Sequence, residues 1–434
     1  MLFAVFIVLL FSSVSLSQST VKHLSLREAI AAATSNNNAI KLSALDVQVA
    51  QTKLRQTDAI FLPQANFSYT AATTTNPLNA FGFKLQQGSI TPADFNPELL
   101  NNPSATPDFS TKFELHQPLL NVDMLYQRKG AAKQVEMYQL LTNRTREYLY
   151  FETEKAYLQL QMAYNENKVL VETLVTSKAV YKSSKDYYKE GLIQKSDLLN
   201  AELQVMNIET QLKSSQSAIL DVSDMLSILM GASAGTVYTI DSMSINNAFT
   251  EDSTDLLTDR SDFKAMEKGM ESYDMMIKSS KMSYLPRLNA FASYQWNDKS
   301  MFGFNASSHF TGIQLQWNIF NGNRTKNTIS QQRLEKEKLA KQLDQQKIEA
   351  QLQINKVRRQ LSDASFVIKQ QQLGIEQASE ALRVLQNRYT NGLVKTTDVL
   401  MAQTQLTQQK IGHVRAVFNY NVAAASLHFL TTGK

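Results

Sequence analysis

The sequence predicts a mixed α and β membrane protein in which very long helices alternate with short strands. The first observation is the distribution of helix breakers: residues 131–190 contain no glycine or proline, and residues 323–391 contain only Gly374. Uninterrupted stretches of this kind are typical of long helices rather than compact domains. The second observation is an alternation of apolar and polar residues in segments that precede these stretches. The third is an internal repeat, because the same succession of motifs occurs twice along the chain.

The composition argues against several classes of function. The 434 residues carry a net charge of +5, and no basic run is interleaved with aromatic residues as nucleic-acid binding would require. Without cysteine the chain has no disulfide and no thiol chemistry. The histidines lack metal-ligand spacing, the methionines within 270–282 suit core packing, and no catalytic motif is present. We therefore expect no enzyme, no cofactor and no bound metal.

The N-terminal residues are typical of a secretory signal peptide. The run Leu2–Phe11 is apolar but reaches only about half the length that a helix needs to span a bilayer. Ser15 and Ser17 form a small-x-small cleavage site before Gln18. No other segment approaches a transmembrane helix, so we expect any membrane crossing to use strands.

Two pairs of motifs define the repeat. Phe61–Gln64 recurs as Tyr284–Arg287, 223 residues further on, and Tyr188–Ile193 recurs as Tyr389–Val394, 201 residues further on. Each copy is expected to contain a helix, a strand, a loop, a strand, a very long helix, a tight turn and a returning helix. The expected segments are a signal peptide at 1–17, a first repeat at 18–230, a linker at 231–255 and a second repeat at 256–434.

The elements follow from the same patterns. The Pro- and Asn-rich piece Thr74–Asp108, which makes the first copy longer, is expected to be a loop. The other expected elements are strands at about 63–73, 109–120, 286–297 and 309–321, long helices at 122–189 and 323–390, turns at 190–195 and 391–396, and returning helices at 196–230 and 397–430.

The strand segments have one apolar and one polar face. Ile313 and Leu315 alternate with Gln314, for example, although Phe291 interrupts the pattern in the third strand. A length of about 8–11 residues suits transmembrane β-strands with apolar faces toward lipid and polar faces toward a lumen. Four strands cannot close a barrel around a lumen, and a sheet in a bilayer cannot keep open edges. Several chains would then share one barrel; a soluble sheet with one buried face is the alternative for any single strand.

The long helices carry apolar stripes. From Val122 to Tyr188 a continuous helix would be about 100 Å long. Apolar residues at three- and four-residue steps, such as Leu158 and Met162, predict helices packed side by side with one face in water. The helices alone are equally compatible with a plain coiled-coil rod.

Several motifs together resemble the TolC-like outer-membrane efflux protein family, the outer membrane factors, over nearly the whole mature chain. They are the opening Leu24–Ala29, the Asn36–Asn38 run, the strand entry Leu62–Gln64, the strand exits Gln117–Asn121 and Trp317–Gly322, and the turns Tyr188–Asp197 and Arg388–Asp398. The resemblance implies a homotrimer. Its 12-stranded outer-membrane β-barrel would take four strands from each chain and continue as a long periplasmic α-helical barrel, with the linker in an equatorial belt.

The resemblance also implies a function. The chain would be the outer-membrane exit duct of a tripartite efflux system, a passive conduit driven by an inner-membrane pump through a periplasmic adaptor, or membrane fusion, protein. A related alternative is the exit duct of a type I protein secretion system. The alternative from a different class is a non-channel coiled-coil scaffold of the envelope.

The two turns are the candidate binding sites for the adaptor. Gly191 and Gly392 allow the backbone to reverse, and Leu192 and Leu393 beside them offer apolar anchors. The residues alone favour a helix C-cap followed by a packing contact at each turn. The resemblance places both turns at the periplasmic end, where the family meets its adaptor.

Charged residues after the turns are candidates for a gate. Asp197 and Asp398 begin the returning helices, where a carboxylate caps the helix or complements its dipole. By resemblance, Asp398 corresponds to a carboxylate of a constriction ring, and Asp197 and Tyr389 correspond to partners in the links that hold the tip closed. Three Asp398 carboxylates around one axis would attract cations, so we hypothesise that this residue narrows the tunnel and selects for cations.

The sequence departs from the family pattern at two gate positions. Met401 stands where the family has a second ring carboxylate, and Val394 stands where it has the arginine of the closing links. Lys395 is adjacent to the second position and is the candidate replacement for that positive charge.

Overall fold

A computed structural model describes residues 21–245 and 259–431 of the chain. The expected signal peptide at 1–17 and the part of the expected linker after residue 245 lie outside the described residues. The chain divides into two compact units. We call residues 1–44, 141–263 and 345–434 the tip unit, and residues 45–140 and 264–344 the sheet unit.

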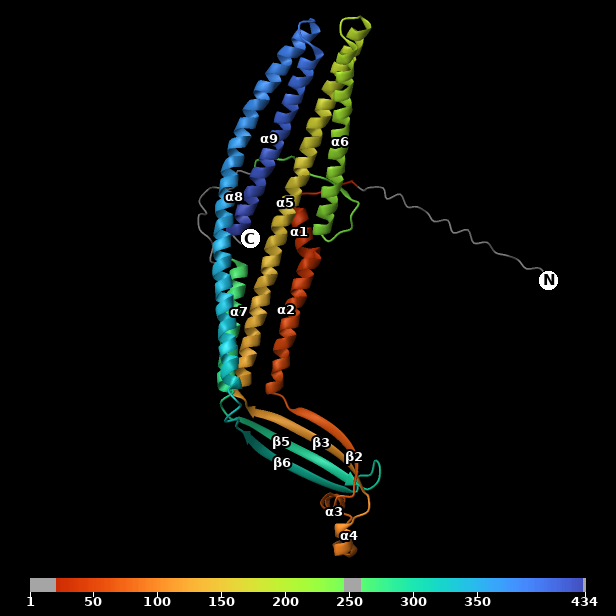
Figure 1. Cartoon of the computed structure of the whole chain (residues 1–434), viewed down its shortest axis with the longest axis vertical. Coiled ribbons are helices and arrows are strands. Elements are labelled where there is room, and N and C mark those ends of the chain that lie inside the picture. The colour runs from red at the N-terminus through yellow and green to blue at the C-terminus, as the bar shows by residue number, and fades with distance from the viewer. Residues whose placement is uncertain (1–20, 246–258, 432–434) are drawn as a thin grey trace, which may run out of the picture. The chain divides into compact units, whose positions relative to one another are not determined.

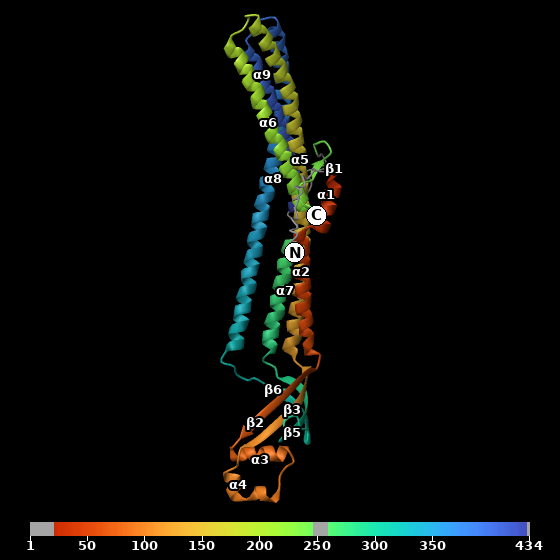
Figure 2. The same cartoon turned by 90° about the vertical axis from the view of Figure 1, so that its right-hand side faces the viewer.

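The tip unit consists mainly of long helices. Their pairs α5–α6 and α8–α9 each run to a tight turn, and Figures 1 and 2 show the two turns near each other. The elements that contribute to this unit are β1 (Val21–His23), α1 (Leu26–Asn36), the start of α2 (Asn38–Gln56), the later part of α5 (Val122–Lys189), α6 (Lys195–Leu229), β4 (Val237–Thr239), the later part of α8 (Arg324–Thr390) and α9 (Thr396–Thr431).

The main core of the tip unit forms where α1 packs against α5 and α6. Ser25 and Glu28 begin α1 with a capping box, because the Ser25 hydroxyl accepts the Glu28 N–H at 3.3 Å and the Glu28 carboxylate accepts the Ser25 N–H at 3.0 Å. Alanines on α1 allow large side chains of the neighbouring helices to approach closely. Members of this buried cluster include Ala29, Ala33, Tyr157, Leu160, Leu226 and Tyr238.

The end of α6 requires a glycine. Gly231 has a φ of +70°, and a Cβ built there would lie 2.7 Å from the carbonyl oxygen of Asn36 at the end of α1. After this turn the chain forms β4, which pairs in parallel with β1 through the register Val21↔Val237. The linker expected at 231–255 thus contains β4, a strand that was not predicted because three residues leave no alternation to detect.

The sheet unit contains a four-stranded antiparallel sheet with the strand order β2-β3-β5-β6, shown in Figure 1. Its β2 and β6 are edge strands of this sheet. The elements of the unit are the remainder of α2, the 3₁₀ turn η1 (Thr57–Ile60), β2 (Gln64–Thr74), α3 (Pro77–Gln86), η2 (Pro92–Phe95), α4 (Pro97–Asn101), β3 (Thr106–Leu120), the first part of α5, most of α7 (Ser261–Met282), β5 (Arg287–Asp298), β6 (Ala306–Gln316) and the first part of α8.

The segment Thr74–Asp108 is more ordered than a loop. Asn76 and Asn96 cap α3 and α4, accepting the N–H groups of Asn79 at 3.1 Å and Glu98 at 3.0 Å. A proline follows each cap at the first helical position, where its missing N–H costs nothing. The Asn and Pro residues that suggested a loop are therefore helix-start signals, and Figures 1 and 2 place both helices at one end of the sheet.

The last strand is shorter than expected. It ends at Gln316 instead of continuing to residue 321. The indole N–H of the next residue, Trp317, donates to the backbone carbonyl of Tyr284 at 2.8 Å. Tyr284 precedes β5, so this contact lies outside the β5–β6 ladder. Alternation in the sequence continues to Ile319, so periodicity alone overextended the strand.

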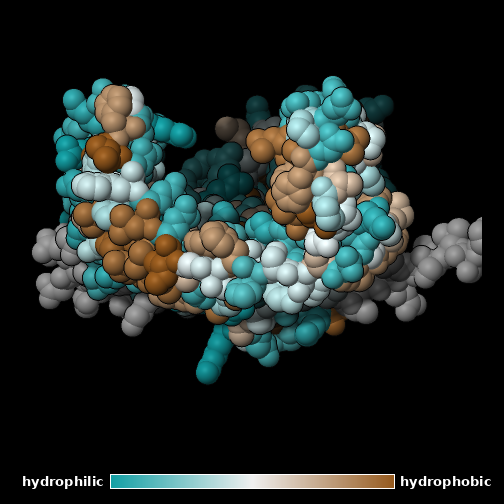
Figure 3. All heavy atoms as spheres, turned by 90° about the horizontal axis from the view of Figure 1, so that it is seen from below, coloured by the Kyte–Doolittle hydropathy of each residue, from teal (hydrophilic) through white to brown (hydrophobic). Residues whose placement is uncertain are grey.

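The two faces of the sheet differ in polarity. Cross-strand partners share a face, and the row Phe67, Phe113 and Tyr294 lies on the apolar face with exposed fractions of 62%, 51% and 42%. The opposite face carries the row Asn66, Glu114 and Ser293. Figure 3 shows that hydrophobic side chains are exposed on the surface of the molecule that faces the viewer in that view. Among the described residues, no segment covers this apolar face, so it remains a large exposed apolar surface.

Helix α7 packs closely against the first part of α5. The Ser272 and Ser279 hydroxyls donate to the carbonyls of Gly130 at 3.0 Å and Asp123 at 2.7 Å. Met275 and Met276 lie against Gly130, where a Cβ would have neighbours at 3.5 and 3.6 Å. This is the packing role expected for methionines in the segment 270–282.

Candidate functional site

Both turns of the tip unit have the same backbone geometry. Gly191 and Gly392 have φ values of +74° and +71°, so each occupies the left-handed region that glycine adopts without strain. At the first turn the Leu192 N–H donates to the Tyr187 carbonyl at 2.8 Å, and at the second the Leu393 N–H donates to the Arg388 carbonyl at 2.9 Å. Both turns are Schellman motifs, which is the C-cap geometry that the residues predicted.

The leucines after the glycines are not packed against their helices. Leu192 is 67% exposed and Leu393 is 68% exposed. The residues of both turns line one open cavity of about 1180 Å³. The hydrophobic packing contact that usually accompanies a Schellman motif therefore does not account for these two leucines, which are available to a partner.

A buried cluster holds the four tip helices together. Tyr389 is 6% exposed and contacts the apolar side chains of this cluster, while its ring meets that of Tyr187 edge to face with centroids 5.5 Å apart. Its hydroxyl lies 3.0 Å from Ser184 Oγ and 3.0 Å from Thr396 Oγ1. The apolar members are Val180, Ala201, Leu382, Val399 and Leu400.

The direction of the Tyr389 hydrogen bonds follows from the partners. Ser184 donates its hydroxyl proton to the Val180 carbonyl at 2.9 Å, so Ser184 Oγ accepts from Tyr389. Thr396 then donates to the phenolic oxygen. Within one chain, Tyr389 thus connects α8 to α5 and to the start of α9.

The aspartates after the turns begin the returning helices. An Asp398 carboxylate oxygen accepts the Lys395 N–H at 3.1 Å, which caps the first turn of α9. Asp197 occupies the equivalent position in the first turn of α6. Asp398, Lys395 and Met401 are exposed, and Met401 is 72% exposed. Asp398 therefore caps its helix, as the residues alone predicted. Its side chain is nevertheless exposed to solvent.

A polar seam between α5 and α9 was not recognised in the sequence. Gln403 is 2% exposed and donates to the Thr173 carbonyl at 3.0 Å and to Ser177 Oγ at 2.8 Å. The Thr173 and Thr407 hydroxyls are 3.1 Å apart. A detectable signal existed, because Thr396, Gln403 and Lys410 follow one another at heptad spacing on α9, where apolar residues are expected.

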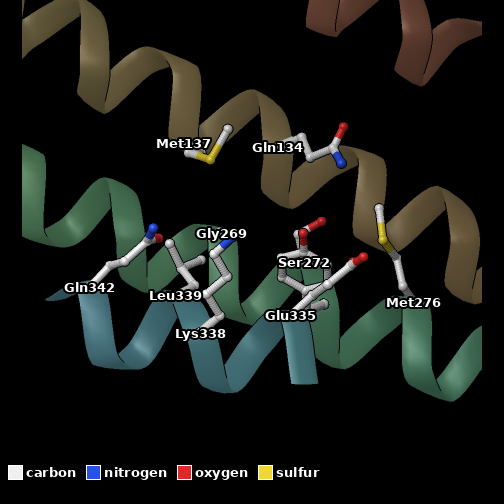
Figure 4. A pocket seen from close by; sticks show the side chains of 10 residues that line it. Gln134, Met137, Gly269, Ser272, Met276, Glu335, Lys338, Leu339 and Gln342 are labelled. Carbon is white, nitrogen blue, oxygen red and sulfur yellow. The ribbon is translucent and has the colours of Figure 1, made fainter. Parts of the chain in front are cut away.

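The sheet unit holds a separate cavity of about 600 Å³ between α5, α7 and α8, shown in Figure 4. Ser272 from α7 and Glu335 and Lys338 from α8 line it together with Met137 and Leu339. Among the described residues, no group of three His, Cys, Asp or Glu side chains is placed to hold a metal ion.

The described helices also include none with the length and hydrophobicity that crossing a membrane requires. The family model for outer membrane efflux proteins matches residues 29–232 and 253–433. The chain therefore belongs to the outer membrane efflux protein family, whose members are TolC-like channels of the outer membrane. None of the curated proteins matches the sequence.

Solved structures of outer-membrane proteins have a similar fold at low sequence identity. The outer membrane channel CmeC of Campylobacter jejuni has a TM-score of 0.76 at 14% identity, over 94% of this chain and 85% of that chain. The outer membrane protein VceC of Vibrio cholerae has a TM-score of 0.76 at 16% identity, over 94% and 96% of the two chains. The open state of the MtrE outer membrane channel of Neisseria gonorrhoeae has a TM-score of 0.73 at 13% identity, over 94% and 88%.

Proposed function

We propose that this protein is a passive exit duct of the outer membrane that works as a homotrimer in a tripartite efflux system. The observation that carries the proposal is the sheet of the sheet unit. One of its faces exposes large apolar side chains such as Ile313 at 69% and Leu315 at 65%, while the other face is polar. Such a sheet suits a wall between lipid and water.

The edges of the sheet support oligomerisation. In the sheet of the described residues, β2 and β6 each pair on one side only. A bilayer offers no water to satisfy the free N–H and C=O groups of an edge. Pairing β6 of one copy with β2 of the next gives a closed barrel, and three copies with four strands each give 12 strands.

The tip unit supports the partners of the proposed system. The exposed Leu192 and Leu393 on two equivalent turns suit contact with a periplasmic adaptor protein, which would couple the duct to an inner-membrane pump. The carboxylate of Asp398 faces solvent beside Lys395 at the start of α9 and suits a constriction around a threefold axis. Asp197 and Tyr389 are proposed partners in closing that constriction, with Tyr389 acting from its buried position between α5 and α9.

The proposal is tested on the full-length protein purified in detergent. Light scattering should give the mass of three chains, and insertion into planar bilayers should give discrete conductance steps. Ile313→Lys places a charge on the apolar face of the sheet. Gln314→Lys is the matched control, because it places the same charge on the polar face of the same strand. We expect only Ile313→Lys to prevent insertion. A monomer that stays in solution without detergent and conducts nothing would refute the proposal.

A further inference from the structure

Two phenylalanines stand on the polar face of the sheet. Phe291 on β5 is opposite His116 and Gly312, and Phe310 on β6 is opposite Ser293. The two rings contact each other with centroids 5.3 Å apart and planes inclined by 42°. Apart from Pro118, the other strand residues that share this face are polar, charged or small, so the pair forms an aromatic patch, with His116 opposite Phe291, among hydrogen-bonding groups.

Phe291 has a structural reason for its position. A Cβ built on Gly312 would lie 2.9 Å from Cζ of Phe291, so the ring covers the glycine from across the ladder. An aromatic side chain in this position shields a backbone that glycine leaves uncovered. This contact explains why Phe291 interrupts the alternation of its strand.

Within the single chain, Phe310 covers no glycine and has no comparable structural reason for its position. Its side chain is 69% exposed, and the residue directly across the ladder is a serine. A side chain that gained stability from burial would belong on the opposite face, where Phe67, Phe113 and Tyr294 meet each other or their neighbours. An exposed ring on a wetted face is available for a molecule in the water.

The surroundings of the pair determine the chemistry that it suits. Glu114 lies in the same cross-strand row as Ser293 and Phe310, and it forms an ion pair with Lys112. The patch therefore combines two aromatic surfaces with the serine hydroxyl, the paired Glu114 and Lys112 charges and the His116 ring on the same face. A planar aromatic solute with a positive charge would stack on the rings and meet favourable electrostatics from their faces.

We propose that Phe291 and Phe310 form a transient binding site for planar aromatic cations on the polar face of the sheet. This inference rests on the proposed function, because that face lines the water-filled passage only if the chain forms a channel. Three copies would present three such sites around the passage. Molecules that stack on the rings would dwell there and interrupt the ionic current.

The test uses the intact trimer in planar bilayers, with ethidium as the probe. Tetrabutylammonium serves as a control, because it carries the same charge without an aromatic plane. We expect ethidium to block the potassium chloride current at lower concentrations than tetrabutylammonium. Phe310→Ser and Phe310→Leu should each raise the half-blocking concentration of ethidium by about threefold or more, as expected for the loss of one aromatic contact.

Two further variants and the conductance itself distinguish the possible outcomes. Phe310→Tyr keeps the ring and should keep the block, while Gln314→Ser changes a neighbouring residue on the same face and should leave it unaltered. Phe310→Leu preserves apolar bulk in the strand, so normal conductance in this variant shows that the channel has assembled. Normal conductance with equal ethidium block in all variants would overturn the inference and leave the proposed function intact. Absence of conductance in every protein would overturn both.

Discussion

Removal of the Tyr389 hydroxyl should loosen the tip by an amount that the structure allows us to estimate. Tyr389→Phe deletes a donor to Ser184 and an acceptor for Thr396, in a cluster where both partners are at most 1% exposed. A buried hydrogen bond contributes about 1 kcal/mol net, so the loss is about 2 kcal/mol. The ring and its apolar contacts remain, so no cavity of consequence is created.

Amide hydrogen exchange followed by mass spectrometry measures this loss locally. If the tip opens as a unit, a loss of about 2 kcal/mol corresponds to exchange that is roughly 30-fold faster in the last turn of α8 and the first turn of α9. Tyr187→Phe is the matched control, because its hydroxyl makes a single exposed contact of 3.5 Å to the Thr390 carbonyl. If the exchange rate at the tip in Tyr389→Phe stays within twofold of the rate in the unaltered protein, Tyr389 is not the link between α5, α8 and α9.

Three further predictions concern stability and selectivity. Hydrogen bonds from two lysines lower the pKa of Glu271. The stability that its carboxylate contributes is therefore fully present above the ordinary glutamate pKa and is lost as pH falls through the lowered pKa. Thermal unfolding followed by circular dichroism should show that Glu271→Gln loses less stability below about pH 4.5 than the unaltered protein does. Gly231→Ala should lower the melting temperature more than Gly191→Ala. Both residues have a positive φ, but only a Cβ at position 231 collides with backbone, at 2.7 Å from the Asn36 carbonyl oxygen. Equal shifts of the melting temperature in the two variants would contradict this prediction. Asp398→Asn should reduce cation selectivity in planar bilayers with little change in stability, since the asparagine side-chain oxygen can also accept the Lys395 N–H. Unchanged selectivity would discard the proposed role of Asp398 in a constriction.

The long helices could be predicted because their signal is local and extended. The helices expected at 122–189 and 323–390 correspond to α5 at Val122–Lys189 and α8 at Arg324–Thr390. The absence of glycine and proline is sufficient to indicate such helices, whatever they pack against. The Schellman turns could likewise be predicted, because their hydrogen bonds connect residues within one turn of the chain.

Features that depend on distant partners could not be predicted in the same way. The position of Phe291 is explained only by Gly312 on the neighbouring strand, and the partners of Tyr389 include Ser184 on another long helix. Alternation also overextended β6, because residues 317–319 keep the pattern of a strand after the ladder has ended. Periodicity shows which face of an element is apolar, but it does not show which residues meet across that face.

The polar seam between α5 and α9 differs energetically from an apolar interface of the same helices. Thr173 donates to a carbonyl one turn back in α5 at 2.8 Å, and Thr407 does the same in α9 at 2.9 Å. When the helices separate, these hydroxyl donors remain satisfied within their own helices, and water can take the place of the hydrogen-bond partners on the opposite helix. An apolar seam would instead expose hydrocarbon at about 25 cal/mol for each Å². The seam therefore gives the tip unit a defined pairing of helices at a lower cost of separation, which suits the closure proposed above for this unit.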